Sequence, residues 1–341
     1  MTNKNCRISH RFLVAGCGSI GQRHIANLKT LGVEQIFACD PLPERLSSIS
    51  LMYNIPQYLD FSEALNAVLP DVVMVCTPPV LHIPQALAAL RSGAHVFVEK
   101  PISHSLEDID KVVTEAESRQ KIVQVGYHLR YHPAIQKVKE LIDKEAIGRV
   151  LWARAEYGAY LPDWRPWQDY RISYTAKRSM GGGIILDGSH EIDYMHWLLG
   201  EVREVFCLAD KLSDLELDVE DTASLTLKFV SGCLGEIHID CVQRIRSRSC
   251  KIVGTEGTLL WDSVEGLRLL KSSSTPQEWE RLGFIVEPND VYLKELFSFL
   301  DCIDKSTPPQ TDALSAKRVL EIALAAKASS LNKQMINLKT I

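Results

Sequence analysis

A lysine at the end of an apolar run is the first residue of this chain that could do chemistry. The run "HVFVEKP" (95–101) is rich in β-branched and aromatic residues, which favours a strand, and it ends in Glu99, Lys100 and Pro101. At that position the ammonium group of Lys100 could donate a hydrogen bond or a proton to a substrate. A solvated lysine at a strand end would show the same local pattern, so the rest of the chain has to decide.

A second group of titratable side chains lies in "GGGIILDGSHEIDYMHWLLG" (181–200), which predicts a helix that begins after three glycines. Asp187, His190 and Asp193 recur at three-residue spacing and should therefore share one face of that helix. Oxidation of an alcohol needs a base for the hydroxyl proton, and histidine, with an unperturbed pKa near 6.5, suits that role at neutral pH. A core histidine that is hydrogen-bonded to Asp187 is the alternative.

Length and composition exclude several classes of protein. With 341 residues, 46% of them hydrophobic and 24% charged, the chain has room for about two domains with ordinary cores. The formal net charge of −5, without a run of Lys and Arg, argues against nucleic acid or an anionic membrane as a partner.

The first ten residues lack the apolar core of a signal peptide, and no apolar run reaches the roughly 20 residues of a membrane span. The nine cysteines form no CxxC pair and follow no metal-ligand spacing. We therefore expect a cytoplasmic protein with reduced thiols and no metal site.

The first third of the chain alternates short apolar runs with helical segments. Residues 20–31 and 83–92 read as helices, because Gly32 and Gly93 follow their ends and Pro84 lies in the first turn of the second. Near-continuous Val, Ile and Phe predicts strands buried on both faces, hence a parallel sheet with helices on each side. The expected strands are 11–18, 35–40, 71–76, 94–100 and 121–127.

After about residue 127 the pattern changes to longer runs that alternate apolar and polar residues. In "DTASLTLKFV", for example, Leu225, Leu227 and Phe229 share one face. This alternation predicts a mostly antiparallel sheet with one face in contact with solvent or a partner. Helices are expected at 133–148 and 312–330, and further strands at 150–160, 232–242, 249–263 and 266–271.

The segment "VAGCGSIG" places Gly16, Gly18 and Gly21 in the G-x-G-x-x-G spacing between a strand and a helix. This spacing permits a tight turn, a close approach of pyrophosphate to the backbone, and close packing of helix on strand. Asp40 ends the next strand, where its carboxylate could accept both ribose hydroxyls of NAD and would repel the 2′-phosphate of NADP. Arg45, five residues later, could soften that preference. A glycine turn with a surface aspartate is the alternative.

The stretch "CTPPVLH" (76–82) places Thr77 and Pro78 at the carboxyl end of the fourth expected strand. Ligands of open α/β sheets bind in the crevice at that end, although the prolines could also simply end the strand. Lys100 ends the next strand at the same edge, so we expect it where the nicotinamide of a bound NAD lies.

The segment 160–180 interleaves aromatic and basic residues. Aromatic faces suit the C–H faces of sugar rings, and arginine forks suit carboxylate or phosphate, which favours a lid over an anionic sugar such as a nucleotide sugar or a sugar acid. A loop that packs on the sheet or on another subunit is the alternative. The residues concerned are Trp164, Arg165, Trp167, Tyr170, Arg171, Tyr174, Lys177 and Arg178.

In this order and spacing, "GCGSIG", "CDP", "CTPP", "VEKP", "GYHLRYHP" and "GGGIILDGSHEID" resemble the Gfo/Idh/MocA oxidoreductases, a family that includes glucose–fructose oxidoreductase and inositol dehydrogenase. The resemblance spans nearly the whole chain. It implies an α/β Rossmann domain with a parallel sheet at 1–126, on which the helix at 312–330 should pack, and an α+β domain at 127–311 with a large open-faced, mostly antiparallel sheet. It also implies an active site between the domains and a homodimer or homotetramer formed through the open sheet.

In that family the lysine of "EKP" and the histidine of the later helix are catalytic, which corresponds to Lys100 and His190, and the peptide before the proline is often cis. Inositol-dehydrogenase-like members place a catalytic aspartate four residues before the histidine, whereas Asp187 lies three before His190. Asp193 therefore competes with Asp187 as the partner of His190. His128 stands where many relatives have Asn, which suggests a differently shaped sugar site. The segment 160–180 is similar to members associated with sialic-acid-like sugars.

The candidate residues follow from the motifs and the resemblance together. The catalytic candidates are Lys100, His190 and Asp187. The cofactor candidates are Gly16, Gly18, Ser19, Ile20, Gly21, Asp40, Arg45, Thr77, Pro78, His82, Glu99 and Lys100. The substrate candidates are Tyr127, Arg130, Trp164, Arg165, Trp167, Tyr170 and Asp193.

The sequence thus predicts an NAD-dependent dehydrogenase that acts on a CH–OH group of a sugar or polyol, in particular an anionic sugar, with NADP as the less favoured cofactor. Two alternatives stay open. One is a glycoside hydrolase that oxidises and re-reduces its sugar with the same NAD. The other is a non-catalytic NAD-binding sensor, which would not need Lys100 and His190 together. The sequence does not determine the substrate, the carbon oxidised or the direction.

Overall fold

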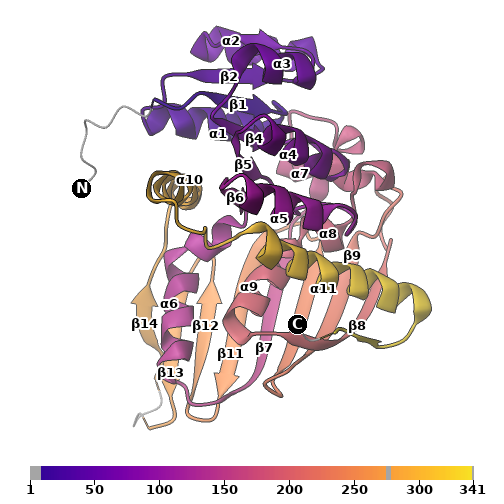
Figure 1. Cartoon of the computed structure of the whole chain (residues 1–341). Coiled ribbons are helices and arrows are strands. Elements are labelled where there is room, and N and C mark those ends of the chain that lie inside the picture. The colour runs from indigo at the N-terminus through magenta and orange to yellow at the C-terminus, as the bar shows by residue number, and fades with distance from the viewer. Residues whose placement is uncertain (1–8, 274–277, 340–341) are drawn as a thin grey trace. The chain divides into compact units, whose positions relative to one another are not determined.

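The computed structural model describes residues 9–273 and 278–339, and the chain divides into two compact units. The first comprises Met1–Tyr127 and Asn289–Lys317, and the second comprises His128–Pro288 and Arg318–Ile341. Each unit is built around its own sheet (Figure 1). Among the described residues, no helix is both long and apolar enough to cross a membrane.

The first unit holds a six-stranded parallel sheet with the strand order β3-β2-β1-β4-β5-β6. Every residue of β1 and β4 is buried, as expected for strands with helices on both faces. Because β1, β4 and β5 are neighbours, the glycine loop, Thr77 and Lys100 follow the carboxyl ends of three adjacent strands. The Rossmann-type architecture predicted from the sequence is therefore confirmed.

Most elements of this unit are short. Among its strands and α-helices, five lie in parts of the chain for which no structure was expected from the sequence: β3, α2, α3, α5 and α10. The strands are β1 (Phe12–Ala15), β2 (Ile36–Cys39), β3 (Gln57–Tyr58), β4 (Val72–Val75), β5 (His95–Val98) and β6 (Val123–Val125). The helices are α1 (Ser19–Thr30), α2 (Pro43–Tyr53), α3 (Phe61–Val68), α4 (His82–Arg91), α5 (Ile109–Ser118) and α10 (Pro288–Lys305), with a 3-10 turn η1 (Pro79–Leu81).

Helix α10 was not expected from the sequence, and it packs in the core of the first unit. Its apolar residues recur at helical spacing and join the cluster around β1, β2 and β4. These buried residues are Leu296, Phe299, Leu300 and Ile303. The chain after α10 then pairs with β6, since Val125 N donates to Thr311 O at 2.8 Å. The structure therefore differs from the expected boundary, because residues 289–311 belong to the first unit.

The second unit holds a nine-stranded sheet with the order β14-β13-β12-β11-β7-β10-β9-β8-β15. Among the described strands, β7 and β10 pair in parallel and the other pairs are antiparallel. The alternation expected around residues 221–230 is present, since Leu225, Leu227 and Phe229 of β9 are buried. The strands are β7 (Val150–Gly158), β8 (Val202–Asp210), β9 (Thr222–Phe229), β10 (Leu234–Asp240), β11 (Ser247–Gly254), β12 (Gly257–Asp262), β13 (Gly266–Lys271), β14 (Glu280–Gly283) and β15 (Ile336–Asn337).

Helices cover one face of this second sheet, where α6, α9 and the C-terminal part of α11 lie across the strands (Figure 1). The opposite face carries exposed apolar side chains, among them Phe206, Leu208 and Leu234. The helical elements are η2 (His128–Tyr131), α6 (Pro133–Asp143), α7 (Leu161–Trp164), η3 (Tyr170–Ile172), η4 (Tyr174–Ala176), η5 (Arg178–Met180), α8 (Ile184–Asp187), α9 (Ser189–Leu199) and α11 (Ala313–Asn332).

Helix α11 begins in the first unit and belongs to the second from Arg318 onward. Ser329 Oγ accepts a hydrogen bond from the Cys207 amide of β8 at 3.0 Å, so the helix satisfies a backbone donor of the second sheet. We expected residues 312–330 to pack on the first domain. Most of the helix belongs instead to the second unit, because its polar side chains satisfy groups of that unit.

Replacing Phe299 by alanine should lower the free energy of unfolding by about 3–5 kcal/mol, because a fully buried aromatic side chain would leave a cavity. Urea-induced unfolding followed by circular dichroism measures this loss. Phe297 lies on the same helix and is 56% exposed, so Phe297→Ala is the control and should cost less than about 1 kcal/mol. Equal losses from the two substitutions would contradict the placement of α10.

Candidate active site

The glycine loop between β1 and α1 has the geometry that a phosphate-binding turn needs. Gly16 has φ +90, and a Cβ at Gly21 would lie 1.9 Å from Gly16 O, so both positions require glycine. A Cβ at Gly18 would meet nothing within 4 Å, which leaves the backbone there open to a ligand. Helix α1 begins at Ser19 and Ile20 with no side-chain cap, so its first amides can bind a phosphate.

Asp40 follows β2 beside this loop, and its carboxylate is almost fully buried. Its Oδ2 accepts a hydrogen bond from the Cys17 amide at 2.7 Å, and Oδ1 accepts one from the Leu42 amide at 3.0 Å. Arg45 Nη1 lies 3.4 Å from Asp40 Oδ2. The contact to Cys17 was not expected, and it shows that Asp40 also holds the glycine loop in place.

His82 joins the segments that follow β4 and β5. Its Nε2 lies 2.7 Å from Thr77 O, and its Nδ1 lies 2.8 Å from Pro101 O. Burial lowers the pKa of His82, and a neutral imidazole donates only one of these hydrogen bonds at a time. Both ring nitrogens face protein carbonyls, so His82 braces the loop that follows Pro78 rather than pointing at a cofactor.

Lys100 lies at the carboxyl end of β5 and is half-buried. The peptide between Lys100 and Pro101 is cis, as the resemblance implied. Glu99 Oε2 accepts a hydrogen bond from the Lys100 amide at 3.2 Å, and Glu99 Oε1 lies 2.7 Å from His24 Nε2 of α1. Sequence reasoning missed His24, although its place three residues after Gly21 puts it on the helix that the glycine loop begins.

The helix expected over the "GGG…H" stretch is interrupted. Helix α8 ends at Asp187 and α9 begins at Ser189, because Gly188 has φ −82 and ψ 19, away from helical values. A Cβ at Gly188 would lie 2.8 Å from Ile184 O, so the break requires glycine. The expectation that one continuous helix carries both Asp187 and His190 is therefore wrong.

The carboxylate of Asp187 is held by two hydroxyl groups. Tyr174 Oη donates to Asp187 Oδ1 at 2.5 Å, and Thr175 Oγ1 donates to Asp187 Oδ2 at 2.7 Å. Both donors come from the 160–180 segment, and Asp187 is only 7% exposed. This segment therefore orients the carboxylate that precedes His190 by three residues.

Asp193 is paired with Arg130 and is completely buried. Arg130 Nε donates to Asp193 Oδ1 at 3.0 Å, and Arg130 Nη2 donates to the same oxygen at 2.6 Å. A buried carboxylate needs such a partner, since an unpaired charge in the interior is costly. Arg130 and Asp193 thus hold η2 to α9.

His190 and the residue after it make two further contacts at the start of α9. The rings of His190 and His128 meet edge to face with their centroids 4.4 Å apart. Glu191 Oε1 lies 2.8 Å from Arg248 Nε, and Arg248 Cζ lies 4.2 Å from the centroid of the Tyr157 ring. Sequence reasoning missed this second pair, for which the run of arginines at two-residue spacing, Arg244, Arg246 and Arg248, was the available signal.

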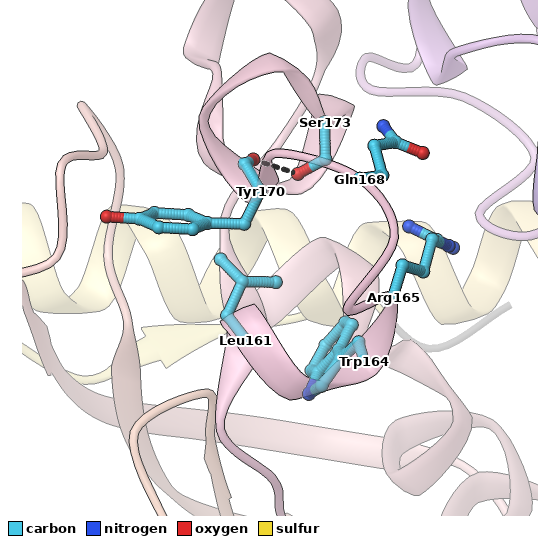
Figure 2. Close-up of a pocket in the computed structure, with 6 residues that line it drawn as sticks. All are labelled: Leu161, Trp164, Arg165, Gln168, Tyr170 and Ser173. Atoms are coloured by element: carbon cyan, nitrogen blue, oxygen red, sulfur yellow. Dashed lines mark hydrogen bonds between the residues drawn. The ribbon is translucent and has the colours of Figure 1, made fainter.

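The 160–180 segment both packs on the sheet and leaves side chains exposed. Trp164 Nε1 donates to Ala159 O at 3.0 Å, whereas Trp167 is 76% exposed. In the small pocket of this segment, Arg165 and Gln168 project to one side and Tyr170 to the other (Figure 2). Of the remaining substrate candidates, Tyr127 is fully buried.

Neither metal binding nor cysteine chemistry has support in the residues that the structure describes. Among them, no group of three or more His, Cys, Asp or Glu side chains could hold a metal ion. The eight described cysteines are all free and buried. Burial raises the pKa of Cys17 and Cys39 to about 12, which keeps these thiols protonated at neutral pH.

Two family models match most of the chain. Residues 10–127 match one described as "Oxidoreductase family, NAD-binding Rossmann fold", and residues 135–260 match one described as "GFO/IDH/MocA C-terminal domain". The two matches thus follow one another along the chain, one on the first sheet and one on the second.

Curated relatives and solved structures align with nearly the full length. The chain is 30% identical to myo-inositol 2-dehydrogenase of Thermotoga maritima, over 97% of this chain and 99% of that protein. It is 27% identical to scyllo-inositol 2-dehydrogenase (NAD(+)) of Bacillus subtilis, over 96% of each chain. The fold resembles that of the WlbA dehydrogenase from Bordetella pertussis, solved with NADH and UDP-GlcNAcA, with a TM-score of 0.83, 24% identity, and coverage of 98% of this chain and 100% of that one.

Replacing Thr175 by valine should lower the free energy of unfolding by about 1–3 kcal/mol, because the buried carboxylate of Asp187 would lose a hydroxyl donor. Urea-induced unfolding of the full chain measures the change. Ser173→Ala is the matched control, since it removes a hydroxyl of the same segment that donates to the Tyr170 carbonyl at 2.6 Å. It should cost about 1 kcal/mol or less. Wild-type stability in Thr175→Val would show that this hydroxyl does not hold Asp187.

Proposed function

This chain belongs to the Gfo/Idh/MocA family of NAD-binding oxidoreductases, and on that premise we propose that it oxidises a ring hydroxyl of an anionic sugar, or reduces the corresponding ketone. The observation that carries the proposal is the buried carboxylate of Asp187, which two hydroxyl donors orient three residues before His190. A carboxylate held in this way suits the support of a histidine base.

The first unit fits NAD. The open backbone at Gly18 and the uncapped amides of α1 would hold the pyrophosphate, and Asp40 would accept the ribose hydroxyls. When bound, NAD+ supplies the acceptor for the hydride that leaves the substrate carbon. Arg45 lies close enough to offset part of the charge of Asp40, so NADP is the less favoured cofactor rather than an excluded one.

The chain's own residues would handle the proton and the developing charge. His190 would take the hydroxyl proton of the substrate, and Lys100 would donate a hydrogen bond to the same oxygen and stabilise its negative charge. Asp187 is the carboxylate that we assign to His190, because Asp193 is engaged by Arg130. Glu99, His82, Arg130 and Asp193 then act as positioning residues, which hold the loops that carry the site.

An anionic sugar is favoured over a neutral polyol by the basic and aromatic side chains of the 160–180 segment. Trp167 is exposed, and Arg165 is half-buried and forms no ion pair with any described carboxylate. Such side chains suit a sugar ring that carries a carboxylate or phosphate. The relatives include proteins named for inositols, which are neutral, so the charge of the substrate is the part of the proposal that most needs a test.

Mixing the protein with NAD and a panel of sugars tests this function, with NADH fluorescence as the readout. The panel spans inositols, free hexoses, uronic acids, sialic-acid-like sugars and nucleotide sugars, and each is assayed with NAD and with NADP. We expect NADH to form with one anionic class. NADH from inositols alone would contradict the anionic substrate. Silence across the panel, with NAD shown to bind, would contradict net oxidation and favour a cofactor that is recycled within each turnover.

On the substrate that this panel identifies, Lys100→Met should lower kcat by at least about a hundredfold, because it removes the hydrogen-bond donor that stabilises negative charge on the substrate oxygen. Binding of NAD, measured by the quenching of tryptophan fluorescence, should remain nearly unchanged. Lys111→Met, which changes an exposed lysine of the same unit, is the control. More than about a tenth of the wild-type activity in Lys100→Met would rule out its catalytic role.

The open face of the second sheet supports assembly into a homodimer or homotetramer. Phe206, Leu208 and Leu234 are 38%, 62% and 47% exposed on that face of a single chain, and such a face is normally covered. Light scattering should therefore give the mass of two or four chains. Leu208→Glu should lower that mass, whereas Leu51→Glu, which changes an exposed leucine of α2, should not. A monomeric wild-type protein would contradict this assembly.

A further inference from the structure

The turn between β10 and β11, residues 241–246, carries two arginines whose charges are not balanced by any carboxylate of the described chain. Arg244 and Arg246 are both exposed, and neither forms an ion pair within residues 9–273 or 278–339. Arg248, two residues later, pairs with Glu191. Two like charges on one turn repel each other, so this arrangement is unfavourable unless an anion binds there.

The guanidinium groups of this turn lie over aromatic rings, in close stacking for Arg244 and at the outer limit of a cation–π contact for Arg246. Arg244 Cζ lies 3.7 Å from the centroid of the Tyr160 ring, and Arg246 Cζ lies 6.0 Å from that of the Tyr157 ring. Stacking restricts the guanidinium plane and leaves its N–H donors at the edge, where they can bind a ligand. A contact with an aromatic ring would account for the position of one arginine at this turn. It does not relieve the repulsion between the charges of the two arginines.

The backbone of the turn is held by hydrogen bonds to its neighbours. Asp240 Oδ1 accepts hydrogen bonds from the amides of Val242 at 2.9 Å and Gln243 at 2.7 Å. Cys241 O accepts one from the Leu161 amide at 2.9 Å, which joins the turn to the start of the 160–180 segment. The two arginines therefore project from a fixed backbone, and binding would lose little conformational freedom.

The turn lies on the same end of the second sheet as the residues near His190. Strands β7 and β10 run in parallel, so their carboxyl ends, Gly158 and Asp240, are register partners. The Tyr157 ring that Arg246 approaches also lies under Arg248, whose Cζ is 4.2 Å from the ring centroid, and Arg248 pairs with Glu191 of α9. The side chains of Tyr157 and Arg248 thus connect Arg246 to Glu191, the residue that follows His190.

We propose that Arg244 and Arg246 bind a phosphate group of the substrate, carried as a phosphomonoester or as the diphosphate of a nucleotide sugar. One carboxylate is satisfied by a single guanidinium fork, whereas the three terminal oxygens of a phosphate accept hydrogen bonds from two forks at once. Binding of phosphate at this site does not depend on catalysis. The assignment of that phosphate to a sugar substrate rests on the proposed function. Sequence reasoning missed these arginines, because they lie outside the 160–180 segment.

Titration calorimetry of the full chain with inorganic pyrophosphate tests the site without turnover, with NAD present at saturation and no sugar, so that the glycine loop is occupied and does not bind the probe. Wild-type protein should bind pyrophosphate at least about tenfold more tightly than malonate, which offers two carboxylates on a scaffold of similar length. The double variant R244Q/R246Q should weaken the binding of pyrophosphate at least about tenfold. Its circular dichroism should match that of the wild type, because both side chains are exposed.

The matched control is R149Q/R281Q, which removes the same charge from two exposed arginines elsewhere in the second unit. Its affinity for pyrophosphate should equal that of the wild type. The proposal is overturned if wild-type protein does not bind pyrophosphate, if it binds malonate equally well, or if the two double variants lose the same affinity. The last outcome would show an effect of net charge alone.

Titration with glucose 1-phosphate and with UDP then distinguishes the two sources of phosphate. Tighter binding of glucose 1-phosphate would indicate a phosphomonoester, and tighter binding of UDP would indicate a diphosphate. Failure of the phosphate site can also be told apart from failure of the proposed dehydrogenase function, which the sugar panel tests. Arginine-dependent binding of pyrophosphate without NADH formation would keep the phosphate site and reject the dehydrogenase proposal. NADH formation by a protein that does not bind pyrophosphate would do the reverse.

Discussion

The contact between His24 and Glu99 connects the two parts of the first unit on which the proposed chemistry depends. His24 lies on α1, the helix that the glycine loop begins, and Glu99 is the residue before Lys100. Both side chains are buried, so neither can exchange this partner for water, and loss of one would leave the other polar group unsatisfied. The position of Lys100 is therefore set through the same helix whose amides would bind the pyrophosphate. His82 adds a second connection, from Thr77 O to Pro101 O.

In the second unit, too, buried pairs of polar side chains connect the elements of the candidate site. Helix α9 buries Asp193 against Arg130 and Glu191 against Arg248, while Tyr174 and Thr175 hold Asp187 just before it. Pairing fixes the side chains as well as neutralising them, since a hydrogen bond is strong only over a narrow range of distances and donor angles. The 160–180 segment consequently shows the packing that was one of the two alternatives expected from its sequence. Its second half packs against Asp187, and its first half keeps Trp167 exposed to solvent.

Much of the fold was predictable because local pattern and tertiary environment agree. The buried strands of the first sheet, the glycine loop and the alternation in β9 each follow from short stretches of residues. Helix α10 was missed, and most of α11 belongs to the second unit although it was expected to pack on the first, for a shared reason. An apolar helical face shows that a helix must pack, but it does not show which of two cores it packs on. The break at Gly188 was missed because the apolar spacing of the stretch is the same with or without it.

The sequence by itself determined which residues could do chemistry and in which elements they lie, because glycine spacing, strand ends and titratable side chains are local properties. It also determined the family, through motifs spread over nearly the whole chain. Only the tertiary structure decided which polar groups are neighbours. Asp193 pairs with Arg130, 63 residues away, and Arg244 of one turn stacks on Tyr160 of another segment. Such pairings depend on sheet register and chain crossings, and no local pattern in the sequence encodes them.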